Sequence, residues 1–249
     1  MTKDSELSAN DNSKAHPWRH CPIGSHYVRE HFVRIPPSKK HPKGLVVTRH
    51  AHCRKNPNGT KDLLSFDEIA YISKHYFTDL PGSPKLNPLT KFGKIGDQYD
   101  NLILLGWVRY WNDVLKFKEP LDPNLIKALI GSESSFKANI SLEKGAHGLM
   151  QLLPETFSYL RDPGKKELKN YFVNINKAKY LEPSANICAG VRWLFRKKST
   201  ASSKLGRDAT WIEAVADYKS YLNEMISGKD PNPKGMERFN ELYEEINSK

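Results

Sequence analysis

The stretch 128–157 brings together a carboxyl group, a glycine-rich step and an amide side chain. Glu133 ends an apolar run, and three apolar residues precede it at helical spacing: Ile126, Leu129 and Ile130. These positions share one face of a helix, so the Glu133 carboxyl group is predicted to emerge on the apolar side. Partial burial disfavours the charged form of a carboxyl group, and a general acid must hold its proton until the reaction. The alternative is that Glu133 lies past the helix end and points to water.

A glycine-spaced segment follows Glu133 and is predicted to form a ligand-facing loop. Gly145 and Gly148 lead into a helix expected to begin near Pro154. Glycine lets the backbone approach a ligand closely. Gln151 offers a donor and an acceptor, which suits sugar hydroxyl and acetamido groups. Met150 is a candidate for the same contact surface, with core packing as the alternative.

These motifs resemble those of the lytic transglycosylases, lysozyme-like enzymes that cleave bacterial peptidoglycan. The family pattern is Glu-Ser-x-Phe, then a twelve-residue step to Gly-Ala-x-Gly-Leu-Met-Gln-Leu, then Pro-x-Thr. The matching residues are Glu133, Ser134, Phe136, Gly145, Ala146, Gly148, Leu149, Met150, Gln151, Leu152, Pro154 and Thr156. The later segment NICAGVRWL resembles a family helix through Asn186, Ile187, Gly190 and Leu194. The resemblance covers about residues 98–225 and does not extend to residues 1–90.

Two departures from the family pattern bear on the site. The family places a serine three residues before the first loop glycine, where this chain has Leu142 and carries Ser141 one position earlier. The last motif normally reads Ala-Tyr-Asn-Ala-Gly, and this chain has ADYKSY, with Tyr218 matched and Lys219 in place of the asparagine. Tyr218 is expected to hydrogen-bond either Glu133 or the saccharide. A lysine close to Glu133 would favour the charged carboxylate, which opposes the work of a general acid.

The resemblance implies a specific reaction. Glu133 would protonate the β-1,4 glycosidic oxygen between N-acetylmuramic acid (MurNAc) and N-acetylglucosamine (GlcNAc), and would then act as a base on the muramoyl 6-hydroxyl. The product would be 1,6-anhydroMurNAc, and no cofactor would be required. The substrate-binding residues implied are Ser134, Gly148, Met150, Gln151 and Tyr218.

Two alternatives remain within the same fold. A muramidase, which hydrolyses the bond, would need a second carboxylate roughly 5–9.5 Å from the first. Asp217 beside Tyr218 is the leading candidate, and Glu143 and Glu155 are the others. The second alternative is a catalytically weak peptidoglycan-binding scaffold, which the altered ADYKSY motif favours.

The composition and the charge limit the classes of binding partner that are expected. The chain has 249 residues, of which 38% are hydrophobic and 27% charged, and its net charge is +11. Residues 1–60 hold 11 Lys/Arg against 4 Asp/Glu, so +7 of this charge lies there. A basic surface attracts nucleic acid, anionic lipid or an acidic wall polymer. No nucleic-acid recognition motif is found, so nucleic acid is not expected as a partner. The longest apolar run, Leu102–Val108, is too short to span a membrane.

The N-terminal residues have no apolar core of the kind found in Sec signal peptides. The protein is expected either to stay in the cytoplasm, to leave by a signal-independent route, or to begin after a removed signal. Action on the bacterial cell wall, in the periplasm or outside the cell, would then require non-classical delivery or release by lysis. A phage lysin or a delivered toxin fits this pattern, with peptidoglycan glycan strands as substrate and a delivery apparatus or an immunity protein as partners. A monomer is expected.

The chain is predicted to be mainly α, a lysozyme-like helical domain with a small irregular N-terminal extension. Residues 1–15 read as a disordered leader, 16–95 as a basic His/Cys-rich region and linker, and 96–249 as the lysozyme-like transglycosylase domain. Within 16–95, GLVVTRH is the one β-like run, and 65–77 is expected to be a helix capped by Ser65 and Glu68. Asp122 and Pro123 predict the start of the helix that carries Glu133.

Histidines and cysteines gather in the N-terminal region. Seven of the nine histidines and two of the three cysteines lie in residues 16–53. Cys21, His26, His52 and Cys53 are a candidate tetrahedral zinc set. A Cys21–Cys53 disulfide is the alternative if the protein works outside the cytoplasm, and free side chains in a basic docking surface are the third. Cys188 is predicted to be core packing.

Overall fold

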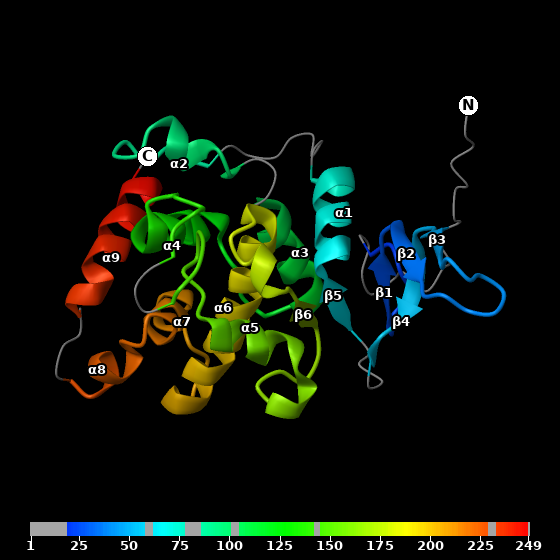
Figure 1. The fold of residues 1–249 in the computed structure, drawn as a ribbon. Helices are drawn as coiled ribbons and strands as arrows, with labels where there is room; N and C mark the ends of the chain where they lie inside the picture. Colours follow the sequence, from blue (N-terminus) through cyan, green and yellow to red (C-terminus); the bar gives the residue numbers. More distant parts are fainter. Residues whose placement is uncertain are drawn as a thin grey trace.

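The computed structural model describes residues 19–57, 62–77, 86–100, 105–141, 145–228 and 233–248. A small β unit stands beside a larger helical body (Figure 1). The prediction of a mainly α fold is confirmed. The predicted leader, residues 1–15, lies outside the described residues.

The β unit consists of two antiparallel pairs. β1 pairs with β4 and β2 with β3; the strands are β1 Ser25–Val28, β2 His31–Ile35, β3 Leu45–Arg49 and β4 His52–Lys55. The predicted β-like run is β3, but the irregular extension expected around it was wrong. Strands of only four or five residues leave a weak alternation in the sequence, and they form here by pairing with each other.

The zinc set predicted from Cys21, His26, His52 and Cys53 does not form. Cys21 and Cys53 are joined by a disulfide, so neither sulfur is a thiolate that could bind zinc. His26 Nδ1 is 2.8 Å from Asn56 Oδ1, and His52 Nδ1 bonds a backbone carbonyl. No group of three or more metal-binding side chains gathers anywhere in the described ranges.

The disulfide is expected to stabilise the β unit. It joins the segment before β1 to β4 across a sequence separation of 32 residues. A Cys21→Ser/Cys53→Ser variant should lose roughly 2–4 kcal/mol of stability in this unit, because its unfolded chain is no longer constrained. Limited proteolysis would show faster cleavage within residues 19–57. Added reductant should speed cleavage of the wild type and leave the variant unchanged, and equal cleavage of both proteins without reductant would contradict the prediction.

β5 (Leu63–Ser65) and α1 (Phe66–Tyr76) connect the β unit to the helices. Ser65 caps α1 as predicted, by accepting a hydrogen bond from Glu68 N. β5 pairs in parallel with β6 (Phe172–Asn174), and the Phe77 ring packs edge-on against Trp107 at 5.0 Å between centroids. Both elements precede the predicted domain boundary at residue 96, yet they share the core of the helical body.

The helical body is arranged around one long central helix, α6, which contacts α1, α3, α5 and α7 (Figure 1). A second packed pair is α4 with α9. The helices are α2 Lys94–Asp97, α3 Leu105–Leu115, α4 Pro123–Ser134, α5 Pro154–Arg161, α6 Pro183–Leu205, α7 Trp211–Tyr218, α8 Leu222–Ile226 and α9 Lys234–Asn247. Short 3-10 turns lie at Pro163–Lys165 and Lys177–Lys179. Within the described ranges, no helix has both the length and the hydropathy of a membrane span.

α4 is held at its start and in its first half. Asp122 caps its start by accepting from Asn124 N, and Pro123 occupies the first turn as predicted. Lys127 is fully buried on α4 and donates to Asp100 at 2.5 Å. Burial raises the pKa of Asp100 to about 6, against the opposing effect of Lys127. These contacts fix the helix that carries Glu133.

Candidate active site

Glu133 lies on the last turn of α4, at the edge of its buried face. Ile126, Leu129 and Ile130 are fully buried, and the Glu133 side chain is 18% exposed. The helical spacing therefore places the carboxyl group between core and solvent, as the sequence indicated. A carboxyl group in this position is shielded from bulk water and still accessible to a ligand.

The chain turns sharply after α4. Ser135 and Phe136 both have positive φ, at 53° and 63°, which is uncommon for residues other than glycine. The turn is held by the buried Phe136 ring, which packs on Phe92 at 5.1 Å. Ser134 bonds back to Ile130 O and is buried, so the structure gives this predicted substrate-binding residue a role within the helix.

The segment from Gly145 to Leu152, called the glycine loop, is held on α6 by the side chain of Asn186. Its Oδ1 accepts from Met150 N at 2.8 Å. Its Nδ2 donates to His147 O at 3.0 Å and to Tyr180 O at 2.9 Å. A Cβ at Gly148, whose φ is +74°, would lie 2.5 Å from Asn186 Nδ2, so this close packing requires glycine. The sequence matched Asn186 to a family helix but did not reveal that it organises the loop.

Met150 and Gln151, two predicted substrate-binding residues of the glycine loop, are both buried but differ in their partners. Met150 is fully buried, and a Cβ at Gly190 would lie 2.2 Å from its sulfur, so Met150 fills the core against α6. Its assignment as a substrate contact is not supported, because no part of the side chain reaches solvent. Gln151 donates from Nε2 to Gly148 O at 2.6 Å, while its buried Oε1 has no hydrogen-bond partner within the described chain. Gln151 thus holds one unused acceptor, which is buried in the free protein.

α7 closes the site through Tyr218. Its hydroxyl donates to Met150 O at 2.6 Å, which ties α7 to the glycine loop. Burial, and to a smaller extent the charge of Glu133, raises the pKa of Tyr218 well above its ordinary value. The hydroxyl therefore stays protonated and acts as a donor. The predicted hydrogen bond from Tyr218 goes to a backbone carbonyl, not to Glu133.

Lys219 is the direct partner of Glu133. The Lys219 Nζ lies 2.5 Å from Glu133 Oε1, and the two side chains are 11% and 18% exposed. The asparagine position of the family motif is thus occupied by a cation in contact with the candidate catalytic carboxylate.

Asp217, the leading candidate for a second carboxylate, faces α6. Its side chain is 3% exposed, with Oδ1 2.5 Å from Lys204 Nζ and Oδ2 3.2 Å from Lys197 Nζ. Two lysines therefore neutralise this carboxylate. Glu155 is exposed on the first turn of α5, as expected, and Glu143 lies outside the described residues.

Asp217→Asn is expected to reduce stability and to spare catalysis. The substitution leaves Lys197 and Lys204 without their acidic partner, which should cost roughly 1–3 kcal/mol because both lysines are partly exposed. Thermal unfolding and the rate of glycan cleavage would be measured below the melting temperature of the variant. A folded variant with a hundredfold slower rate would instead restore Asp217 as a catalytic residue.

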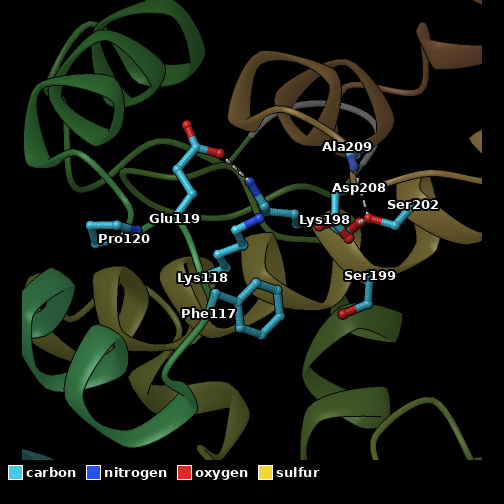
Figure 2. Close-up of a pocket in the computed structure, with 9 residues that line it drawn as sticks. All are labelled: Phe117, Lys118, Glu119, Pro120, Lys198, Ser199, Ser202, Asp208 and Ala209. Carbon is cyan, nitrogen blue, oxygen red and sulfur yellow. Dashed lines mark hydrogen bonds and ion pairs between the residues drawn. The ribbon is translucent and has the colours of Figure 1, made fainter.

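A separate cavity of about 700 Å³ lies between α6 and the segment after α3 (Figure 2). It is lined by Phe117, Lys118, Glu119, Pro120, Lys198, Ser199, Ser202, Asp208 and Ala209. None of these is a predicted site residue. Lys198 already donates to Glu119 Oε2 at 2.8 Å, and the Ser202 hydroxyl accepts from Ala209 N (Figure 2). Because these polar groups are satisfied, the cavity offers little to a polar ligand.

The family model described as the transglycosylase SLT domain matches residues 112–229. The match covers 118 of the 249 residues, and this part of the chain is called the SLT domain below. The SLT domain thus includes α4, the glycine loop and α7, the three elements that meet around Glu133. The match agrees with the family that the sequence motifs resemble.

Two solved structures are similar to the chain. One is the lytic transglycosylase Slt from Pseudomonas aeruginosa, in an inactive mutant form, with 18% identity and a TM-score of 0.37 over 58% of this chain and 21% of that one. The other is the 70 kDa soluble lytic transglycosylase from Escherichia coli, with the same identity and TM-score over 61% of this chain and 26% of that one. The chain thus spans about a quarter or less of either protein. No curated protein matches it in sequence.

Proposed function

We propose that the SLT domain cleaves the β-1,4 bond between MurNAc and GlcNAc in peptidoglycan, as a lytic transglycosylase. The observation that carries the proposal is Glu133, a partly buried carboxyl group at the junction of α4, the glycine loop and α7. The match of residues 112–229 to the SLT family model supports the choice of substrate.

Glu133 would act first as an acid and then as a base. In the first step its proton passes to the glycosidic oxygen, the bond from that oxygen to MurNAc C1 breaks, and GlcNAc leaves as the alcohol. Positive charge then develops at C1. In the second step the Glu133 carboxylate takes the proton from the muramoyl 6-hydroxyl, whose oxygen bonds C1. The ring closes to 1,6-anhydroMurNAc, Glu133 regains its proton, and no water is consumed.

The surrounding residues would position this reaction. Asn186 and Tyr218 hold the backbone of the glycine loop from two sides, so the loop is preorganised before a ligand arrives. For the buried, unpartnered Oε1 of Gln151 to accept a hydrogen bond from a sugar hydroxyl or acetamido group, this side chain would have to turn outward.

Lys219 opposes the first step and favours the second. Its ammonium group holds Glu133 Oε1 in an ion pair, whereas proton transfer to the glycosidic oxygen needs the carboxyl group free of that contact. Substrate binding must therefore loosen the ion pair before the bond breaks. This contact is also the observation that favours the alternative function, a wall-binding scaffold with weak catalysis.

Mass spectrometry of soluble products from purified peptidoglycan tests the proposal. Products with 1,6-anhydroMurNAc ends are expected. Reducing muramic ends would show hydrolysis by a muramidase, and the search for a second carboxylate would then turn to Glu143. A folded protein that binds the wall and releases no product would support the scaffold.

The place of action is proposed to be the bacterial wall, in the periplasm or outside the cell. The Cys21–Cys53 disulfide supports this placement, because disulfides persist in oxidising compartments. A role as a delivered toxin or a phage lysin, with a delivery apparatus or an immunity protein, stays a prediction. Expression with and without an added export signal would test it, since lysis only on export would locate the target outside the cytoplasm.

A further inference from the structure

One face of the β2–β3 pair presents apolar side chains to solvent. Phe32 pairs with Thr48 across the strands and Arg34 with Val46, so these four residues point to the same side; we call them the β2–β3 face. Phe32 is 77% exposed and Val46 is 58% exposed. An aromatic ring this exposed contributes little to folding and marks an interaction surface.

The β2–β3 face lies within a strongly basic unit. Residues 19–57 contain nine Lys/Arg and one acid, Glu30. Arg19 and Arg29 pair with acids outside the unit, and Glu30 bonds His50. The other seven cations are exposed and form no ion pair with any residue the structure describes: Arg34, Lys39, Lys40, Lys43, Arg49, Arg54 and Lys55. Their countercharge must come from another molecule or from salt.

The basic unit is held firmly on the helical body. The Arg19 guanidinium binds Glu68 at 3.2 Å, Asp62 at 3.2 Å and the Leu63 carbonyl at 3.0 Å. Ser65, the cap of α1, also donates to Tyr27 O on β1. None of these contacts uses the β2–β3 face, so a ligand can occupy it without competing with the fold. Anything bound there is held at a fixed orientation to the SLT domain.

We propose that the β2–β3 face docks the protein on peptidoglycan, with Phe32 against the apolar face of a sugar ring and the surrounding cations on carboxylates of the stem peptides. The inference rests on the proposed function for the choice of polymer. A single-stranded nucleic acid is typically bound by cations together with several aromatic rings on which successive bases stack. This face has a single ring and an adjacent aliphatic side chain. Alternating apolar sugar faces and carboxylates match that pattern.

Sedimentation with insoluble peptidoglycan tests the docking. The background is full-length Glu133→Gln, so that cleavage does not release the protein. Adding Phe32→Ala and Arg34→Ala is expected to weaken retention about tenfold at 0.15 M salt, the usual loss on truncating aromatic and arginine anchors. Adding Ile95→Ala and Lys169→Ala, an exposed apolar and an exposed basic residue outside the unit, should change it less than twofold. Equal retention of both variants, or tighter binding to DNA than to peptidoglycan, would overturn the proposal.

Cleavage assays separate this inference from the proposed function. In the protein that keeps Glu133, the Phe32→Ala/Arg34→Ala variant should cleave short soluble glycan fragments at the wild-type rate. It should cleave insoluble peptidoglycan about tenfold more slowly. If the wild type binds to peptidoglycan but cleaves neither substrate, the docking proposal stands and the enzymatic proposal fails. If the variant slows on both substrates alike, the docking inference fails and the catalytic one stands.

Discussion

Replacing Glu133 by glutamine is expected to lower the rate of peptidoglycan cleavage by about a thousandfold or more, since general acid–base groups contribute about 10²–10⁴. One carboxyl group is proposed to serve as both acid and base, so Glu133→Gln removes both steps at once. The amide preserves the shape of the side chain at the end of α4, and the fold should persist. Release of 1,6-anhydroMurNAc products over time is the measurement.

Glu155→Gln is the matched control for this variant. Glu155 lies within the same SLT domain, exposed on the first turn of α5, and has no proposed part in the reaction. The control should keep the wild-type rate. A Glu133→Gln protein that still released anhydro products at more than a tenth of that rate would remove Glu133 from the mechanism.

Lys219→Asn is expected to raise the cleavage rate at neutral pH about tenfold, or about 1.4 kcal/mol in activation free energy. The substitution removes the ammonium group that lies 2.5 Å from Glu133 Oε1. No ion pair then has to open before the carboxyl group transfers its proton in the first step. The rate on short soluble glycan fragments should be compared, so that wall binding does not contribute.

Lys219→Arg provides the control because it keeps a positive charge at the site. Its rate should stay within about threefold of the wild type, whereas Lys219→Met should be faster, as Lys219→Asn is. A slower Lys219→Asn enzyme would show the opposite role for this residue. Lys219 would then be needed to orient Glu133 or to stabilise the carboxylate in the second step.

Features set by neighbouring residues were predictable from sequence. The start of α4 follows from Asp122 and Pro123, whose capping and backbone preferences act within one turn. The position of Glu133 at the edge of the core follows from the 3.6-residue period of the apolar residues before it. The motifs around the glycine loop also indicated the family whose model matches residues 112–229.

Features that depend on contacts between distant segments were not predictable in this way. The roles of Met150 and Asn186 depend on the packing of the glycine loop against α6. Asn186 on α6 lies 36 residues after Met150, whose backbone N–H it binds. Cysteine and histidine spacing admitted both zinc and a disulfide, and only the pairing of β1 with β4 brings Cys21 to Cys53. The sequence identified the Lys219 substitution, but its contact with Glu133 depends on the packing of α7 near α4.

Asn186 sets a limit on how this protein can diverge. Its side-chain amide donates two hydrogen bonds and accepts one, all with backbone groups. The three partners therefore require the polarity of the amide as well as its shape. Aspartate has the same size but would set oxygen against two carbonyl oxygens, and leucine would leave all three groups unpaired. Either substitution therefore breaks at least two of the three hydrogen bonds at once. Lys219 makes one contact at the edge of solvent, and the same site can change its chemistry there without losing its architecture.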